Sequence, residues 1–402
     1  MRRLEEVFEE AFGARPALLV RAPGRVNLIG EHIDYNDLPV FPMALQREVR
    51  IALRPRRDEK VVLHSSDERF PAIEFEIAPA IEPWVQGAWG NYVKAPANEL
   101  ARRYAIRKGF DGVLESDIPV AAGLSSSSAI VNAVGLALAH INEVSAEPRE
   151  LASIMAEAER FVGTQGGGMD QAISLGARDR CAAKITFHPL RLRHVPVPDD
   201  WRFIVADSGQ IAEKSGPLQA AYNLRRKECD EALRVVAEHL SMRDVTRTLH
   251  TSYPDLCGAF DVDTLVGIGV EVLHGSLLRR FRHAVSEAAR VEEAVGCMRA
   301  ADLEGFGTLM DGSHASLKTD YDVSSDALDE LVAAAKGGGA VGARLTGAGF
   351  GGCVVALANR WTVGEVIETL AAEYYERHYQ AERLSERLFT AVPSRGASVH
   401  EV

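Results

Sequence analysis

The chain has 402 residues, of which 47% are hydrophobic and 25% charged, and 57 acidic against 45 basic residues give a formal net charge of −12. This length predicts two domains, and the composition is that of a globular protein with a full hydrophobic core. The negative charge argues against general binding to nucleic acid or to an anionic membrane, because both need clustered cations. Small anionic ligands are still compatible with it, since loops bind them through backbone donors.

The first half of the chain predicts short strands mixed with helices. Hydrophobic patterns predict helices over 4–12, 91–104, 130–141 and 151–162, and strands over 17–21, 49–53, 61–64, 73–77 and 112–117. Pro96 must kink the second of these helices or lie in its first turn. The almost wholly apolar composition of 130–141 predicts a buried helix.

The second half is richer in helical patterns. A turn at 196–200 precedes a predicted strand over 203–207, so we place the domain boundary there and predict domains 1–195 and 196–402. Helical patterns run from 218 to about 335, including 223–239 and 328–335; strands over 344–346 and 353–357, a helix over 363–378 and a strand over 388–392 follow. Strands and helices without regular alternation predict an α+β fold.

Targeting and thiol patterns point to the cytoplasm. The five cysteines are scattered and form no Cys-x-x-Cys pair, which indicates free thiols in a reducing compartment rather than a disulfide frame or a zinc site. The N-terminus runs into an acidic amphipathic helix without the apolar core of a signal peptide, and no apolar stretch is long enough to span a bilayer. We therefore expect a cytoplasmic protein.

The most informative stretch runs from residue 24 to residue 35, where Arg25, Glu31, His32 and Asp34 interrupt an aliphatic run flanked by glycines. Each of these polar groups must be paired or hydrated beside apolar neighbours, so their density is costly in an ordinary turn. Carboxylates and an imidazole offer hydrogen bonds to a hydroxyl-rich ligand. The alternative is a surface turn in which Arg25 pairs with Glu31 or Asp34.

A serine-rich loop precedes the buried helix predicted over 130–141. The start of a helix has unpaired amide donors and a positive dipole end, so it binds phosphate well, and a serine hydroxyl can also ligate Mg²⁺. Simple N-capping would need only one serine. The chain has no Gly-Lys-Ser/Thr here, which argues against a Walker loop. The residues of this predicted phosphate loop are Gly123, Leu124, Ser125, Ser126, Ser127 and Ser128.

Two further loops are rich in glycine. Three glycines at 166–168 precede Asp170, which is a plausible acceptor for a hydroxyl proton if a cation such as Arg25 lies near it. The alternative is that Asp170 caps a helix over 171–175. A Gly-x-Gly-x-x-Gly spacing begins at Gly347, but the βαβ context of a dinucleotide-binding fold is missing, so a bulged hairpin or a wall near a nucleotide fits equally.

In this order and over this length, the loops resemble the GHMP family of small-molecule kinases, and its galactokinase branch in particular. The run at 24–35 is similar to the sugar-binding signature of that branch, the serine loop to the family's phosphate loop, and the loop at 346–353 to its C-terminal glycine motif. Similar further stretches are Pro42-Met43-Ala44, Asn91-Tyr92-Val93, Tyr222-Asn223-x-Arg225-Arg226-x-Glu228-Cys229 and Ser313-His314-Ala315-Ser316-Leu317. The resemblance implies a two-domain α+β kinase, with an N-terminal domain like ribosomal protein S5 domain 2 and a ferredoxin-like C-terminal domain.

The same resemblance implies an ATP-dependent sugar 1-kinase that phosphorylates D-galactose at its anomeric hydroxyl, acting with Mg²⁺ as a monomer or weak homodimer. Arg25 becomes the cation that stabilises the phosphoryl group and the ionised Asp170, which faces the anomeric hydroxyl. The serine loop becomes the ATP phosphate cradle, with Ser127 as the Mg²⁺ ligand. The implied sugar-binding residues are Glu31, His32, Asp34, Gly167 and Tyr222.

Departures from the galactokinase pattern leave the sugar open. Ile33 stands where many galactokinases have Thr, and Leu38 where many have Gly. Ile33 and the four serines look more like the N-acetylgalactosamine kinase subgroup, whereas Tyr222 favours galactose as the substrate. A galacturonate kinase would want an extra cation, for which Arg47 or Arg50 is available. A non-catalytic sugar sensor is the third alternative, against which the intact phosphate loop argues.

Overall fold

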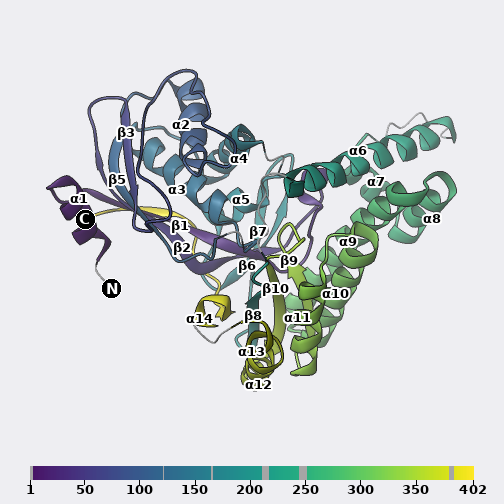
Figure 1. Cartoon of the computed structure of the whole chain (residues 1–402). Coiled ribbons are helices and arrows are strands. Elements are labelled where there is room, and N and C mark those ends of the chain that lie inside the picture. The colour runs from purple at the N-terminus through teal and green to yellow at the C-terminus, as the bar shows by residue number, and fades with distance from the viewer. Residues whose placement is uncertain (1–2, 121, 164–165, 211–216, 244–250, 380–383) are drawn as a thin grey trace.

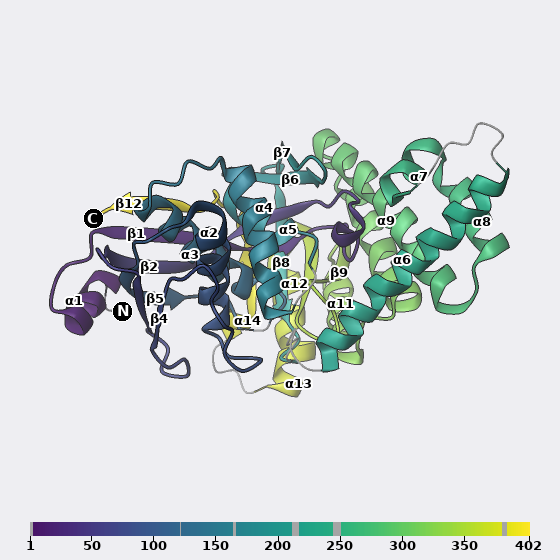
Figure 2. The ribbon, with the colours of Figure 1, turned by 90° about the horizontal axis from the view of Figure 1, so that it is seen from above.

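The structure is a computed structural model that describes residues 3–120, 122–163, 166–210, 217–243, 251–379 and 384–402. Figure 1 shows a large sheet with helices packed on it at one end of the molecule and a group of long helices at the other. Seen from above, the molecule is elongated and both chain termini lie at the sheet end (Figure 2). The protein is thus organised as two parts, which meet in its middle.

A six-stranded sheet forms the frame of the first part. Its strand order is β12-β1-β2-β5-β3-β4, in which β3 and β5 run parallel and the other neighbours antiparallel. The strands are β1 (Leu18–Asn27), β2 (Pro42–Pro55), β3 (Lys60–Ser65), β4 (Ile73–Glu76), β5 (Phe110–Ser116) and β12 (Ser398–Glu401). All five strands predicted in this part overlap these elements, so the prediction is confirmed there.

Helices pack on both faces of this sheet: the first lies against Ala52 and Val113 on one face, and the others lie on the opposite face and place two of the loops. They are α1 (Leu4–Phe12), α2 (Asn91–Tyr104), α3 (Ser126–Ile141), α4 (Pro148–Ala158) and α5 (Met169–Gly176). The bounds predicted for the first two are confirmed exactly, and Pro96 lies inside α2 beyond its first turn. Most residues of α3 are buried, as its apolar composition predicts, and it approaches α4 so closely that a Cβ at Gly135 would lie 2.1 Å from the Met155 sulfur.

A four-stranded antiparallel sheet forms the frame of the second part, with the order β11-β8-β10-β9. Its strands are β8 (Trp201–Asp207), β9 (Gly342–Thr346), β10 (Cys353–Asn359) and β11 (Leu388–Ala391). The accompanying helices are α6 (Pro217–Arg243), α7 (Tyr253–Ala259), α8 (Val262–Val272), α9 (Gly275–Ala300), α10 (Leu303–Ser316), α11 (Asp326–Gly337), α12 (Val363–Leu370), α13 (Glu376–His378) and α14 (Leu384–Arg387). Buried apolar side chains of both sheets belong to one continuous core.

Three strands were missed by the sequence analysis. The hairpin of β6 (Cys181–Thr186) and β7 (Arg191–Pro196) is rich in cations, which dilutes its strand pattern. The short strand β12 pairs with β1, with Leu18 opposite Glu401. The last residues of the chain therefore join the first sheet, and the domains 1–195 and 196–402 stay a prediction.

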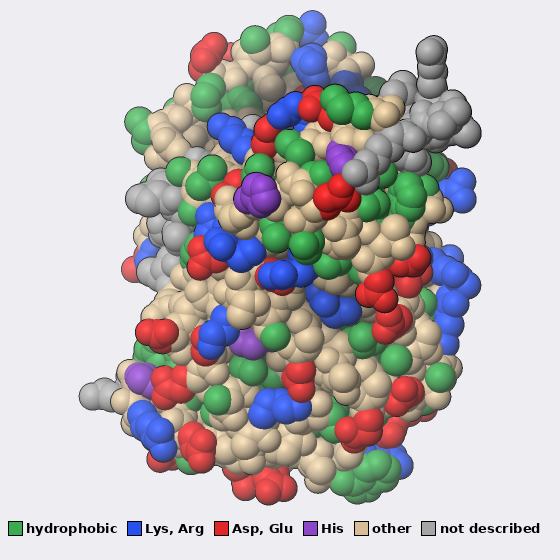
Figure 3. All heavy atoms as spheres, turned by 90° about the vertical axis from the view of Figure 1, so that its right-hand side faces the viewer, with side chains coloured by type: hydrophobic (Ala, Val, Ile, Leu, Met, Phe, Trp, Pro, Cys, Tyr) green, Lys and Arg blue, Asp and Glu red, His purple; other side chains and the backbone are tan. Residues whose placement is uncertain are grey.

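The outer surface carries charges of both signs. On the face drawn in Figure 3, side chains of Lys and Arg are interspersed with those of Asp and Glu. Among the described helices, none combines the length and apolar character needed to cross a membrane.

Candidate active site

Backbone segments from three distant parts of the chain meet at the candidate active site. Near the end of β1, after an irregularity in its pairing between Pro23 and Arg25, the Arg25 backbone N–H donates to the carbonyl of Leu124 at 3.2 Å. Gly123 lies against the loop after β9, where a Cβ at Gly347 would come within 2.6 Å of the Gly123 carbonyl oxygen. Gly347 also has φ of +86°, a conformation that favours glycine, so both the contact and the turn need this residue.

Arg25 and Asp170 form a buried ion pair at the centre of these loops. The Arg25 Nε donates to Asp170 Oδ1 at 2.7 Å and its Nη1 donates to the carbonyl of Gly123 at 2.6 Å, while Arg25 is only 2% and Asp170 9% exposed. Burial opposes the charge of Arg25, but the carboxylates of Asp170 and Glu31 outweigh it, and its pKa is raised. The pairing of Arg25 with Glu31 or Asp34 that we considered is therefore replaced by a pair with Asp170.

Serine hydroxyls surround the other side of Asp170. Ser125 Oγ donates to Asp170 Oδ2 at 2.5 Å, and Ser128 Oγ lies 3.5 Å from the same oxygen. Ser127 and Ser128 also donate to the carboxylate of Glu159, at 3.3 and 3.0 Å. The serine loop thus ties the ion pair to a second buried carboxylate, instead of only capping α3, whose first turn receives no side-chain cap from Ser125.

Each signature carboxylate has its own anchor. Glu31 Oε2 accepts a hydrogen bond from Arg344 Nη2 at 3.0 Å, and both side chains are buried. Asp34 Oδ2 accepts one from the backbone N–H of Gly167 at 3.2 Å. A Cβ at Gly167 would lie 2.2 Å from the backbone of Asp34, so only glycine permits this approach. Both carboxylates are held in fixed positions before any ligand arrives.

An aromatic cluster closes the site beside these carboxylates. The Tyr222 ring lies 5.5 Å from the rings of both His32 and Tyr35. Burial, with the nearby charges of Asp34 and Asp170, raises the pKa of the Tyr222 hydroxyl well above its usual value, so it stays protonated. His32 Nε2 donates to the carbonyl of Ala348 at 3.1 Å and its Nδ1 accepts from the Tyr35 hydroxyl at 3.0 Å. A sugar hydroxyl would have to share His32 with these partners.

Helix α9 supports the signature loop from behind. The fully buried Glu287 accepts hydrogen bonds from the backbone N–H of Gly30 at 2.9 Å and of Glu31 at 3.3 Å, and from Ser313 Oγ at 2.6 Å. Burial raises the pKa of the Glu287 carboxyl, but the positive charge of Arg290 outweighs it and the pKa falls to about 2. An ionised carboxylate that accepts from these three donors and from Arg290 Nε at 2.7 Å therefore fixes the backbone at the sugar-binding signature.

His283, on the same helix, is buried in its neutral form. Its Nε2 donates to the carbonyl of Glu31 at 3.0 Å, its Nδ1 accepts from Ser316 Oγ at 2.9 Å, and burial lowers its pKa to about 4. The unfolded chain, with a histidine pKa near 6.5, binds this proton more readily, so acid favours unfolding. The contribution of His283 to stability is complete above about pH 6.5 and falls by about 3 kcal/mol as the pH approaches 4.

The measurement is the melting temperature between pH 7.5 and pH 4.5. We expect His283→Asn, which has no titrating ring, to lower the melting temperature at neutral pH and to flatten its decline in acid. His140 is exposed at the end of α3, and His140→Asn is the matched control, with an unchanged slope. A His283→Asn slope equal to that of the wild type would contradict the assignment.

The cavity at this site has a volume of about 30 Å³. The residues that line the cavity are Arg25, Glu31, His32, Asp34, Glu159, Gly166, Gly168, Met169, Asp170, Gln171, Tyr222, Gly347 and Ala348.

The structure brings most of the predicted site residues together and adds partners that the sequence did not indicate. Of the serine loop, Ser125 and Ser128 contact Asp170, whereas Ser127 faces Glu159. Residues 121 and 164–165, which adjoin the two predicted loops, lie outside the described residues. The sequence did not indicate Glu159, Gln171, Glu287 or Arg344 as site residues. The nearest signal was the family-like stretch that begins at Ser313, whose hydroxyl donates to Glu287.

Comparison with known families identifies the class of protein. The GHMP kinases N terminal domain matches residues 91–177, and the GHMP kinases C terminal domain matches residues 293–376. The galactokinase galactose-binding signature matches residues 6–55, which include the loop from Arg25 to Asp34. The fold and the site therefore define a GHMP kinase, and the two-domain α+β prediction is confirmed.

Individual relatives narrow the class further. The chain is 39% identical over 381 residues to a galactokinase of Roseiflexus sp. (strain RS-1), covering 93% of this chain and 91% of the relative, and 38% identical to one of Chloroflexus aggregans, covering 91% and 90%. The crystal structure of Lactococcus lactis galactokinase complexed with galactose superposes with a TM-score of 0.85 at 31% identity, covering 98% of each chain. The chain belongs to the galactokinase family and is a sugar kinase.

Proposed function

We propose that this protein transfers the γ-phosphoryl group of ATP to the anomeric hydroxyl of D-galactose, giving galactose 1-phosphate and ADP. The observation that carries the proposal is the buried Arg25–Asp170 pair in a cavity that the signature carboxylates Glu31 and Asp34 also line. The similar Lactococcus lactis structure contains galactose, which supports the choice of sugar.

The geometry suggests a role for each charged group. Asp170 presents a carboxylate that can accept or polarise the anomeric proton, and a cation 2.7 Å away favours its ionised form. Arg25 also offsets the repulsion between this carboxylate and the incoming phosphate. Phosphoryl transfer depends mainly on positioning and charge neutralisation, so either role of Asp170 is adequate. Glu31 and Asp34, held by Arg344 and Gly167, would accept hydrogen bonds from sugar hydroxyls.

We further propose that ATP phosphates lie at the serine loop and that Mg²⁺ accompanies them. Ser127 Oγ and the Glu159 carboxylate are hard oxygen donors at the start of α3, which suits Mg²⁺ bound through few protein ligands and several phosphate oxygens. When bound, the ion would supply charge neutralisation at the phosphates. The described residues contain no cluster of three or more metal-binding side chains, which is consistent with an ion that arrives with the nucleotide.

The alternative substrates receive less support. Arg50 pairs with Glu115 at 2.9 Å, and Arg47 donates to the carbonyl of Asp117 and stacks on Phe389, so neither candidate for galacturonate lines the cavity. N-Acetylgalactosamine stays a second candidate, because Ile33 and the serine loop resemble that subgroup. Because the chain is a sugar kinase, the non-catalytic sensor is not proposed.

The setting of the enzyme is also a proposal. All five cysteines are free thiols, which supports a reducing, cytoplasmic environment. We propose that the enzyme works there as a monomer or weak homodimer, with neither nucleic acid nor membrane as a partner, in accord with the net charge of −12.

The direct test measures ADP release with galactose, N-acetylgalactosamine, galacturonate, arabinose and mevalonate, and identifies the product by ³¹P NMR. We expect the highest kcat/KM with galactose and a phosphate at C1. A C1-phosphate missing from the galactose product, together with turnover of mevalonate, would overturn the proposal.

Ser127→Ala tests the metal ligand. Loss of one oxygen donor should lower kcat by roughly 10- to 1000-fold, by analogy with loss of a single electrostatic donor, and should raise the Mg²⁺ concentration needed for half-maximal rate. Galactose binding without nucleotide should barely change. Ser145→Ala is the control, because Ser145 is exposed in the loop before α4 and does not line the cavity. Equal losses in both variants, or an unchanged Mg²⁺ requirement, would reduce Ser127 to a structural role.

A further inference from the structure

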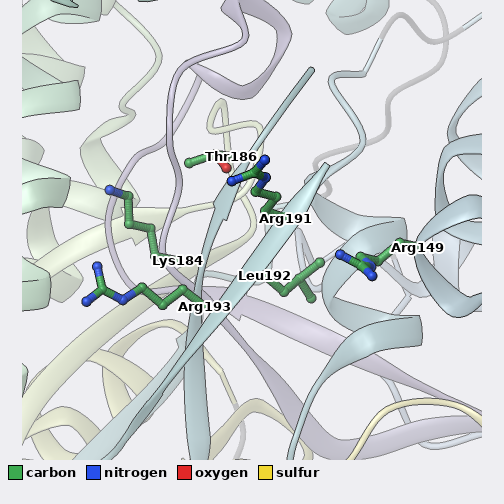
Figure 4. A pocket seen from close by; sticks show the side chains of 6 residues that line it. All are labelled: Arg149, Lys184, Thr186, Arg191, Leu192 and Arg193. Atoms are coloured by element: carbon green, nitrogen blue, oxygen red, sulfur yellow. The ribbon is translucent and has the colours of Figure 1, made fainter. Parts of the chain in front are cut away.

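A basic groove lies outside the active site, between the β6–β7 hairpin and the start of α4. Its volume is about 560 Å³, which falls in the range of small-molecule sites. Four of the six lining residues are cations and none is acidic, on a chain whose net charge is −12. No residue of the groove lines the active-site cavity. The lining residues, labelled in Figure 4, are Arg149, Lys184, Thr186, Arg191, Leu192 and Arg193.

The strand register gathers three of these cations on one face of the hairpin. Lys184 lies directly opposite Arg193, and Thr186 lies opposite Arg191, two residues along on the same face. Figure 4 shows the side chains of Lys184 and Arg193 rising from the same side of the hairpin, while Leu192 points away toward Arg149. Like charges opposite each other destabilise a strand pair, so this arrangement costs stability unless an anion offsets it.

The protein offsets this positive charge only in part. Lys184 pairs with Glu292 of α9. Within the part of the chain that the structure describes, the guanidinium groups of Arg149, Arg191 and Arg193 form no ion pair, and all three residues are exposed. A ligand would therefore meet cations whose hydrogen-bond donors are available.

We propose that this groove binds a small organic phosphate that carries at least two negative charges. Guanidinium groups bind phosphate oxygens in a bidentate manner, and Arg191 and Arg193 are spaced to hold one phosphate group between them on the same face as Lys184. The Thr186 hydroxyl, on the same face, supplies a further donor.

The hairpin is also connected to the sugar-binding side of the molecule. Ile185, between two groove residues, exchanges backbone hydrogen bonds with Val40 at 2.9 and 3.1 Å. An occupant of the groove thus contacts a strand that is bonded to the segment following the sugar-binding signature. A long nucleic acid fits less well, because it needs an extended basic surface and the chain has a net charge of −12.

The test is calorimetric titration of the full-length enzyme, saturated with galactose and ADP, with inorganic pyrophosphate, glucose 6-phosphate or AMP. We expect R191Q/R193Q to weaken binding of the preferred probe by at least roughly 10-fold. R57Q/R299Q is the matched control, because it removes the same charge from exposed residues that do not line the groove, and it should change affinity by less than about 2-fold. The relative affinities of the three probes separate the contribution of the phosphates from that of the organic group.

Both double variants should keep the melting temperature and the basal turnover of the wild type, which separates this proposal from the proposed kinase activity. Equal affinity of R191Q/R193Q and the wild type for every probe would overturn the proposal. Equal weakening in the two double variants would also overturn it, because the effect would then be general electrostatics. Binding of a short RNA through Arg191 and Arg193, more tightly than any of the three probes, would assign the groove to another ligand class and overturn it as well.

Discussion

Asp170→Asn is expected to remove nearly all phosphoryl transfer while both substrates still bind. Asp170 accepts from Arg25 Nε on one oxygen and from Ser125 Oγ on the other. Asparagine keeps the shape but loses the charge, and its amide nitrogen cannot accept from either donor. We expect kcat to fall by roughly 10³-fold or more, since proton acceptance and charge placement are lost together. The measurements are kcat from ADP release and galactose affinity from calorimetry.

The partner variant, Arg25→Lys, keeps a positive charge but loses the planar fork that reaches both Asp170 and the Gly123 carbonyl. We expect it to retain a little turnover. If the two residues act as a unit, the double variant should be scarcely worse than Asp170→Asn alone. Arg21→Lys is the matched control, because Arg21 lies on the same strand, pairs with Glu48 and does not line the cavity. Fully multiplicative losses in the double variant would contradict a shared site.

Local patterns in the sequence were enough to predict most elements of the fold. The helix at 4–12 was predictable because Leu4 and Phe8, one turn apart, are its buried residues. The strands of the hairpin were not, because arginines dilute the pattern of β7 and the position of the hairpin depends on a bridge between Val40 and Ile185. Strand β12 is short and polar, and only its pairing with β1 defines it. Long-range pairing, which no local window contains, accounts for these misses.

The sequence indicated the parts of the site that approach a ligand, but not the groups that hold them. Glycines and clustered polar residues are unusual enough to stand out, as at Arg25 and Asp170. Glu287 and Arg344 look like any charged residue on a helix or strand, yet they are fully buried against the signature loop. Their role depends on the packing of the second part of the chain onto the first, which sequence spacing does not show.

Glu287 does not line the active-site cavity, but its substitution should lower the stability of the protein and disturb the sugar site. Removing the carboxylate in Glu287→Ala leaves Arg290, Ser313 and two backbone N–H groups of the signature loop without their acceptor. Breaking one side of a buried ion pair typically costs about 3–5 kcal/mol, and we expect a loss of that size in the free energy of unfolding, measured by urea denaturation. Glu287→Gln, which keeps an acceptor oxygen, should lose less.

The kinetic consequence should fall on the sugar rather than on the nucleotide. Glu287 holds the backbone of Gly30 and Glu31, whereas the serine loop is held by Asp170 and Glu159. In Glu287→Gln, measured at a temperature where it is folded, we expect KM for galactose to rise while KM for ATP stays near the wild-type value. Glu293→Ala, exposed on the same helix, is the matched control and should change the free energy of unfolding by about 0.5 kcal/mol or less. If KM for galactose and KM for ATP rise in parallel, Glu287 stabilises the whole protein and has no specific effect on the sugar site. A local shift of the signature loop would raise KM for galactose alone.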